Sequence, residues 1–147
     1  QLPGIGTNAP LAGTPLGEAT VVDLEGNDVD ISSLIGRPLV INVWFSTCPP
    51  CKRELPAFAA ANATYGDRVR FVGINTQDSP ERTRSFAAEL GVTYELLRDP
   101  DGEFLVANGI AAFPTTLLVD ADGTVVRQRA GEMTQAELEA AIEELLA

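Results

Sequence analysis

Short apolar runs and stretches with helical periodicity alternate along this chain of 147 residues, and this pattern predicts an α/β fold. The apolar run from Pro38 to Phe45 is typical of a central strand that is covered on both faces. Further strands are expected over Arg68–Asn75 and Tyr94–Arg98. These three segments predict the middle of a sheet.

Two β-hairpins are predicted as well. Each consists of two strand-like segments around a turn that contains glycine: 19–23 with 28–31, and 115–120 with 124–129. The first hairpin lies near the N-terminus, before the central strand.

Helices are predicted where a start signal and a stop signal enclose helical periodicity. One runs from the residues after Cys51 to about Tyr65, a second from Ser79 to Gly91, and a short third over 103–108. A capping box over 134–137 begins the last helix. The element order predicts a mixed central sheet with helices on both faces.

Residues 1–17 are rich in proline and glycine and almost free of charge. We expect them to form a flexible tail or tether outside the core. Residues 18–147 suit one domain. Because the chain begins at Gln1 without a methionine, we also expect an upstream segment, either a signal peptide that is cleaved or a membrane anchor that is retained.

The net charge of −11 argues against nucleic-acid binding, which needs a basic patch. No apolar run approaches the roughly 18 residues that are needed to cross a bilayer. The chain contains only two cysteines and no histidine, so it is not a disulfide scaffold.

Cys48-Pro49-Pro50-Cys51 lies where the central strand gives way to the first helix. Two cysteines in this position predict a dithiol redox site. The unpaired N–H groups at a helix N-terminus favour a thiolate on Cys48, and Cys51 lies one turn further on. Pro49 and Pro50 fit a helix start, where amides would be unpaired anyway.

A zinc site usually needs four ligands, and this chain lacks the histidines and further cysteines to supply them. A copper chaperone that binds Cu(I) through Cys48 and Cys51 is an alternative, because two thiolates suit Cu(I). No metal and no cofactor beyond the redox-active cysteine pair is expected.

Glu54 follows Cys51 by three positions, so the two side chains share a helix face. A carboxylate there is a candidate proton shuttle for the thiols. The alternative is an acid that is favourable in the first turns of a helix for dipole reasons alone. For Pro114, the spacing by itself indicates only a strand start.

The stretch over 20–56, TVVDLEGNDVDISSLIGRPLVINVWFSTCPPCKRELP, resembles the thioredoxin-like proteins of the TlpA/ResA/CcmG (DsbE-like) group. The resemblance continues through Phe113-Pro-Thr-Thr116 to the last helix and implies a thioredoxin-like fold with an inserted helix over 78–91. Proteins of this group are bacterial, extracytoplasmic and usually membrane-tethered thiol–disulfide oxidoreductases.

The resemblance also implies roles for single residues. Cys48 matches the attacking cysteine and Cys51 the resolving one, while Glu54 matches a glutamate near the dithiol. Pro114 matches a cis-proline beside the site, and the backbone of Phe113 before it is expected to pair with an extended substrate.

Two positions depart from the pattern. Asn42 replaces the buried acid of thioredoxin, which leaves Glu54 as the carboxylate for this site. Thr47 replaces a common tryptophan next to the first cysteine, and this removes a large apolar wall.

The resemblance implies a reductant whose substrates are protein disulfides, such as those of apocytochrome c CxxCH motifs. Nothing in the sequence demands more than a monomer, and a monomer is expected. A membrane electron donor of the CcdA/DsbD type would restore the dithiol. A thiol reductant for oxidase assembly and a DsbE-like oxidant in protein folding are the alternatives within the group.

Overall fold

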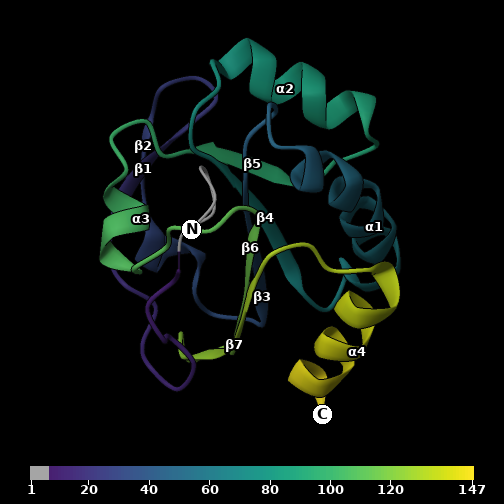
Figure 1. The fold of residues 1–147 in the computed structure, drawn as a ribbon. Helices are drawn as coiled ribbons and strands as arrows, with labels where there is room; N and C mark the ends of the chain where they lie inside the picture. Colours follow the sequence, from purple (N-terminus) through teal and green to yellow (C-terminus); the bar gives the residue numbers. More distant parts are fainter. Residues whose placement is uncertain (1–6) are drawn as a thin grey trace.

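A seven-stranded mixed sheet runs through the middle of the protein in the computed structural model, which describes residues 7–147 (Figure 1). The spatial order of the strands is β2-β1-β5-β4-β3-β6-β7. β3 and β5 flank β4 in parallel, and the remaining neighbours pair antiparallel. The strands are β1 Thr20–Asp23, β2 Asp28–Asp30, β3 Leu39–Trp44, β4 Arg70–Asn75, β5 Glu95–Arg98, β6 Thr115–Val119 and β7 Val125–Ala130.

Four α-helices cover the sheet, and they lie close to the predicted positions. α1, α2 and α4 pack against one face, which we call the redox face, and α3 packs against the opposite face (Figure 1). The α/β fold with a mixed sheet and helices on both faces is therefore confirmed, together with both hairpins. The helices are α1 Pro49–Tyr65, α2 Pro80–Glu89, α3 Glu103–Ala107 and α4 Gln135–Leu146.

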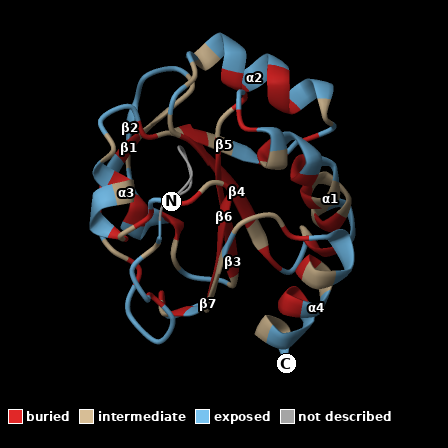
Figure 2. Cartoon of the chain, in the orientation of Figure 1, coloured by how far each residue is buried: buried red, intermediate tan, exposed pale blue. Residues whose placement is uncertain are grey.

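The central strand β3 separates two cores. Every residue of β3 is buried, as the continuous apolar run predicts (Figure 2). Val40 and Trp44 face the redox-face core, whereas Ile41 and Val43 face the opposite core. The period of two along a strand produces this division.

Residues 7–17 wrap against the domain, so the prediction that this segment lies outside the core is wrong for Leu11 and Leu16. Both side chains are buried in the core of the opposite face. The backbone of Gly13 donates a 2.7 Å hydrogen bond to the carbonyl of Val125, at the free edge of the sheet. Two apolar anchors and edge pairing outweigh the flexibility that proline and glycine indicate. Residues 1–6 of the expected tail lie outside the described residues.

The start of β4 differs from the predicted one for a local reason. β4 begins at Arg70 and not at Arg68, because Arg68 and Val69 both donate backbone hydrogen bonds to the carbonyl of Tyr65 in a turn after α1. α1 itself continues through Pro56. No helix of the described residues is long and apolar enough to cross a bilayer.

Candidate redox site

Cys48 and Cys51 form a disulfide at the N-terminus of α1, directly after β3. Cys48 is the N-cap residue, and its sulfur accepts a 3.3 Å hydrogen bond from the backbone N–H of Cys51. The two Cα atoms lie 5.2 Å apart. An anion on Cys48 would thus accept a hydrogen bond from an amide of the first helical turn, which is the arrangement that favours a thiolate.

The two sulfurs differ in access. The side chain of Cys48 is 5% exposed, whereas Cys51 is completely buried. Pro49 and Pro50 occupy the first two helical positions, and Thr47 stands exposed on the other side of Cys48. An incoming sulfur therefore reaches Cys48 first.

Asp78 holds the loop that leads into Cys48. Its carboxylate accepts hydrogen bonds from the backbone N–H of Ser46 (2.8 Å), the Ser46 hydroxyl (2.7 Å) and the amide of Asn75 (2.7 Å). Burial opposes ionisation there, but the bonds from Asn75 and Ser46 hold the pKa of Asp78 below its ordinary value. The sequence does not reveal this contact, because the partners lie 32 residues apart and carry no motif.

Glu54 lies one turn after Cys51 on α1 and is only 1% exposed. One carboxylate oxygen accepts a 2.9 Å hydrogen bond from the side-chain amide of Asn42, and the other accepts a 2.8 Å bond from the backbone N–H of Met133. Burial raises the pKa of Glu54 from 4.5 to about 7, although these two bonds oppose the shift. Glu54 can therefore take up or release a proton near neutral pH.

Asn42 stands at the position that the resemblance marks as an acid in thioredoxin, and it pairs with Glu54 directly. Its carbonyl oxygen is buried without a partner among the described residues. After a rotation of the amide, this oxygen is suited to accept a hydrogen bond from the protonated form of Glu54. Asn42 thus provides a partner for either protonation state.

Within residues 7–147, further polar atoms are buried without partners on the same face, among them the Nε1 of Trp44 and the hydroxyl of Tyr94. Both residues belong to the redox-face core, together with the two cysteines. Burial and the nearby charge of Glu54 raise the pKa of Tyr94. Trp44 is fully buried and stacks on Phe86.

The peptide bond between Phe113 and Pro114 is cis, as the resemblance implies. The ring of Phe113 meets the ring of Phe45 edge to face, with centroids 5.3 Å apart. β6 begins directly after Pro114 and pairs with β3, which ends directly before the cysteine loop. The sheet therefore brings the predicted residues Phe113 and Pro114 next to the end of the strand that leads to Cys48.

A hollow of about 340 Å³ lies between the start of α1, the segment before Pro114 and the end of β7 with the loop after it. The loop after β7 forms its far wall, and the backbone N–H of Gly131 in this loop donates a 2.8 Å hydrogen bond to the carbonyl of Pro114. Arg53 and Glu132 pair across the rim at 2.8 Å. The lining residues are Pro50, Arg53, Ala112, Phe113, Ala130, Gly131 and Glu132.

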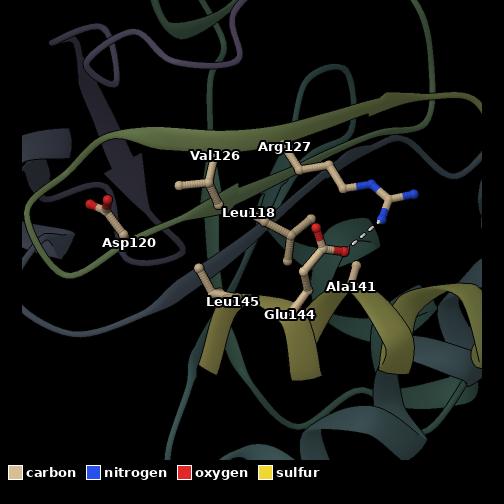
Figure 3. Close-up of a pocket in the computed structure, with 7 residues that line it drawn as sticks. All are labelled: Leu118, Asp120, Val126, Arg127, Ala141, Glu144 and Leu145. Atoms are coloured by element: carbon tan, nitrogen blue, oxygen red, sulfur yellow. Dashed lines mark ion pairs between the residues drawn. The ribbon is translucent and has the colours of Figure 1, made fainter. Parts of the chain in front are cut away.

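A second hollow of about 280 Å³ lies between β6, β7 and the C-terminal part of α4 (Figure 3). Leu118, Val126 and Leu145 provide apolar walls, and Arg127 approaches Glu144 to 3.8 Å. This hollow lies toward the other end of β6 from Pro114, so it is separate from the redox site. Among residues 7–147, no group of three or more His, Cys, Asp or Glu side chains is placed to hold a metal ion.

Comparisons with known proteins agree with this geometry. The Redoxin family model matches residues 11–145. The thiol-disulfide oxidoreductase ResA of Bacillus thuringiensis is 28% identical over 120 residues, which cover 81% of this chain and 69% of ResA.

Two solved structures extend the agreement to the fold. A secreted Mycobacterium tuberculosis disulfide oxidoreductase, homologous to E. coli DsbE, superposes with a TM-score of 0.78 at 29% identity, covering 86% of this chain and 96% of that one. A DsbF homologue from Corynebacterium diphtheriae superposes with a TM-score of 0.80 at 25% identity, covering 99% and 97%.

Proposed function

The chain belongs to the Redoxin family and is a thiol–disulfide oxidoreductase of the ResA and DsbE class, and from this we propose that it reduces protein disulfides outside the cytoplasm. The proposed substrates are apocytochrome c CxxCH motifs, whose thiols must be reduced before haem attachment. The observation that carries the proposal is a shielded cysteine pair at the start of the helix that carries Glu54, a buried carboxyl with a pKa of about 7.

The proposed reaction begins with the dithiol form. The thiolate of Cys48 attacks one sulfur of the substrate disulfide, so that a mixed disulfide forms and one substrate thiolate leaves. Cys51 then gives its proton to the carboxylate of Glu54 and attacks the sulfur of Cys48. The second substrate thiolate leaves, and two electrons have moved from the protein to the substrate. The disulfide described above is the product of this cycle.

The surroundings of the dithiol support the reducing direction. Pro49 and Pro50 remove two backbone donors that would otherwise stabilise a thiolate on Cys48. A negative charge on Glu54 disfavours a thiolate nearby as well. A less stabilised thiolate makes the dithiol form easier to oxidise, so the protein gives up electrons readily. A membrane electron donor of the CcdA/DsbD type then restores the dithiol.

The extracytoplasmic location rests on the relatives. The similar Mycobacterium tuberculosis protein is described as secreted. Disulfide exchange on exported proteins takes place where disulfides persist, which is outside the cytoplasm.

Replacing the resolving cysteine tests the proposal directly. In Cys51→Ser, the attack by Cys48 still occurs but the mixed disulfide cannot resolve, so substrates stay covalently attached and can be identified by mass spectrometry. We expect apocytochromes among them. Cys48→Ser is the matched control, because it lacks the attacking sulfur and should capture none of them.

The reduction potential decides the direction of electron flow. We expect a value near the roughly −270 mV of thioredoxin, measured by equilibration with dithiothreitol buffers. A value near −120 mV, typical of a strong oxidant, would overturn the reductant proposal in favour of a role in disulfide formation.

A further inference from the structure

Asn8 reaches from the N-terminal segment to the loop that carries the cis-proline. Its side-chain oxygen accepts hydrogen bonds from the backbone N–H groups of Ala111 (2.7 Å) and Ala112 (2.8 Å). Its side-chain amide donates a 2.9 Å bond to the hydroxyl of Thr115. One side chain thus holds the loop on both sides of Phe113 and Pro114.

Thr115 extends this network back into the loop. Its hydroxyl, which accepts from Asn8, donates a 2.7 Å hydrogen bond to the carbonyl of Ala112. Thr115 is fully buried, and Ala112 is 5% exposed. Asn8 and Thr115 together therefore satisfy three backbone groups directly before the cis peptide bond: the N–H groups of Ala111 and Ala112 and the carbonyl of Ala112.

The N-terminal segment does not need Asn8 to stay in place. Leu11 and Leu16 anchor it in the core of the opposite face. The backbone of Ala9 also donates a 2.8 Å hydrogen bond to the carbonyl of Gly109, and a Cβ on Gly109 would come within 2.5 Å of the Ala9 Cβ. Because other contacts dock the segment, the bonds of Asn8 serve the loop.

We propose that Asn8 is a positioning residue that preorganises the segment before Pro114 for pairing with an extended protein substrate. This inference rests on the proposed function, in which that segment receives the substrate. Binding to an ordered loop loses less conformational entropy than binding to a mobile one, so Asn8 acts on substrate affinity. It does not touch the cysteines and leaves the sulfur chemistry unchanged.

Two disulfide substrates separate loop pairing from sulfur chemistry. The first is a synthetic peptide with an internal Cys-X-X-Cys-His disulfide, which has a backbone that can pair with the loop. The second is hydroxyethyl disulfide, which has no peptide groups. Steady-state kinetics with both substrates, on the full chain kept reduced by dithiothreitol and with the uncatalysed rate subtracted, give KM and kcat for each variant.

In Asn8→Ala, we expect the KM for the peptide to rise about tenfold, which corresponds to roughly 1.4 kcal/mol, with an unchanged kcat. Turnover of hydroxyethyl disulfide should stay at the wild-type rate. Asn8→Asp should recover much of the affinity, because a carboxylate still accepts from both backbone amides but cannot donate to Thr115.

Asn108→Ala is the matched control. Asn108 also binds the N-terminal segment, through a 2.8 Å bond from the backbone N–H of Gly17, but it makes no bond to Ala111, Ala112 or Thr115. This variant should unfold at a lower temperature than wild type and keep the wild-type KM for the peptide. The control thereby distinguishes weaker docking of the N-terminal segment from a loss of order in the loop before Pro114.

An equal change for both disulfides in Asn8→Ala, no change for either, or the same rise in KM in Asn108→Ala would overturn the role of Asn8. If the wild-type protein reduces both substrates, such an outcome contradicts only the role of Asn8 and leaves the proposed function standing. A wild-type protein that reduces hydroxyethyl disulfide but no peptide disulfide would overturn the proposed function, and the role of Asn8 with it.

Discussion

The two cores of the protein, one on each face of the sheet, differ in their chemistry. The redox-face core contains both cysteines, most of the buried aromatic side chains and the carboxyl of Glu54. Among the described residues, the core of the opposite face consists mainly of leucine, isoleucine and valine around the buried ring of Phe104.

Their buried polar groups differ in part. On the opposite face, Asp99 accepts bonds from the backbone N–H groups of Phe104 and Leu105, and Asn108 is bonded through both of its side-chain atoms. On the redox face, atoms of Asn42 and Thr116 are among those buried without a partner in residues 7–147. The opposite face has such an atom too, the side-chain nitrogen of Gln128, which pairs in the sheet with Leu117 of that core.

The difference shows where the protein gives up stability for chemistry. An unpaired buried polar atom costs about 1–3 kcal/mol, and a buried carboxylate costs more. A proton acceptor that works near neutral pH needs such surroundings, since water would return its pKa to the ordinary value. The opposite face carries none of the groups of the proposed reaction.

The largest expected effect is on stability, from a change to the opposite face. Phe104→Ala deletes a fully buried ring and should lower the free energy of unfolding by about 3–5 kcal/mol. Chemical denaturation measures the loss. The thiol titration of the folded variant should match wild type, and a shifted thiol pKa would show that the two faces are coupled.

The next effect comes from the carboxyl on the redox face. The pKa of Glu54 is about 7 in the folded protein and 4.5 ordinarily, so the folded state keeps a proton that the unfolded chain releases as the pH rises between these values. The contribution of Glu54 to stability should therefore fall by about 3 kcal/mol across this range. Glu54→Gln should lack this fall, as urea titrations at a series of pH values can measure.

Glu54→Gln should also slow disulfide exchange about 100-fold at neutral pH, because Cys51 loses its proton acceptor. Rotation of the Asn42 amide lets the new side chain keep a hydrogen bond, so the variant should fold. Stopped-flow kinetics with a peptide disulfide measures the rate. A wild-type rate in Glu54→Gln would remove Glu54 from the mechanism.

The smallest expected effect compares two buried threonines. The hydroxyl of Thr116 has no partner among the described residues, whereas that of Thr83 donates a 2.8 Å bond to the carbonyl of Ser79. Thr116→Val should raise the free energy of unfolding by about 1 kcal/mol, and Thr83→Val should lower it by about the same amount. Denaturant titration gives both values, and equal signs would contradict the cost assigned to unpaired groups on the redox face.

Local sequence patterns were sufficient for most elements and for the centre of the site. Cys48 and Cys51 stand out by type and spacing, and the helical period places Glu54 above Cys51. Each of these relations spans at most one helical turn, and a short segment of chain contains all the information. The packing of residues 7–17 against the domain was not predicted, because two apolar side chains in a segment rich in proline and glycine have no detectable period.

The supporting contacts were not predictable in this way. Asn8 binds residues more than 100 positions away, and Asp78 binds Ser46 across 32 positions. Glu54 receives one of its two hydrogen bonds from the backbone N–H of Met133. Because every residue except proline offers such a donor, the sequence does not single out Met133 as the partner.

By itself, the sequence determined the α/β order of elements, the dithiol at the start of α1 and the acid one turn beyond it, because periodicity and capping act over a few residues. Only the tertiary structure decided the pKa of Glu54, the partners of Asn42 and the hold of Asn8 on the loop before Pro114. These depend on desolvation and on hydrogen bonds between distant segments, which exist only once the sheet has brought the segments together.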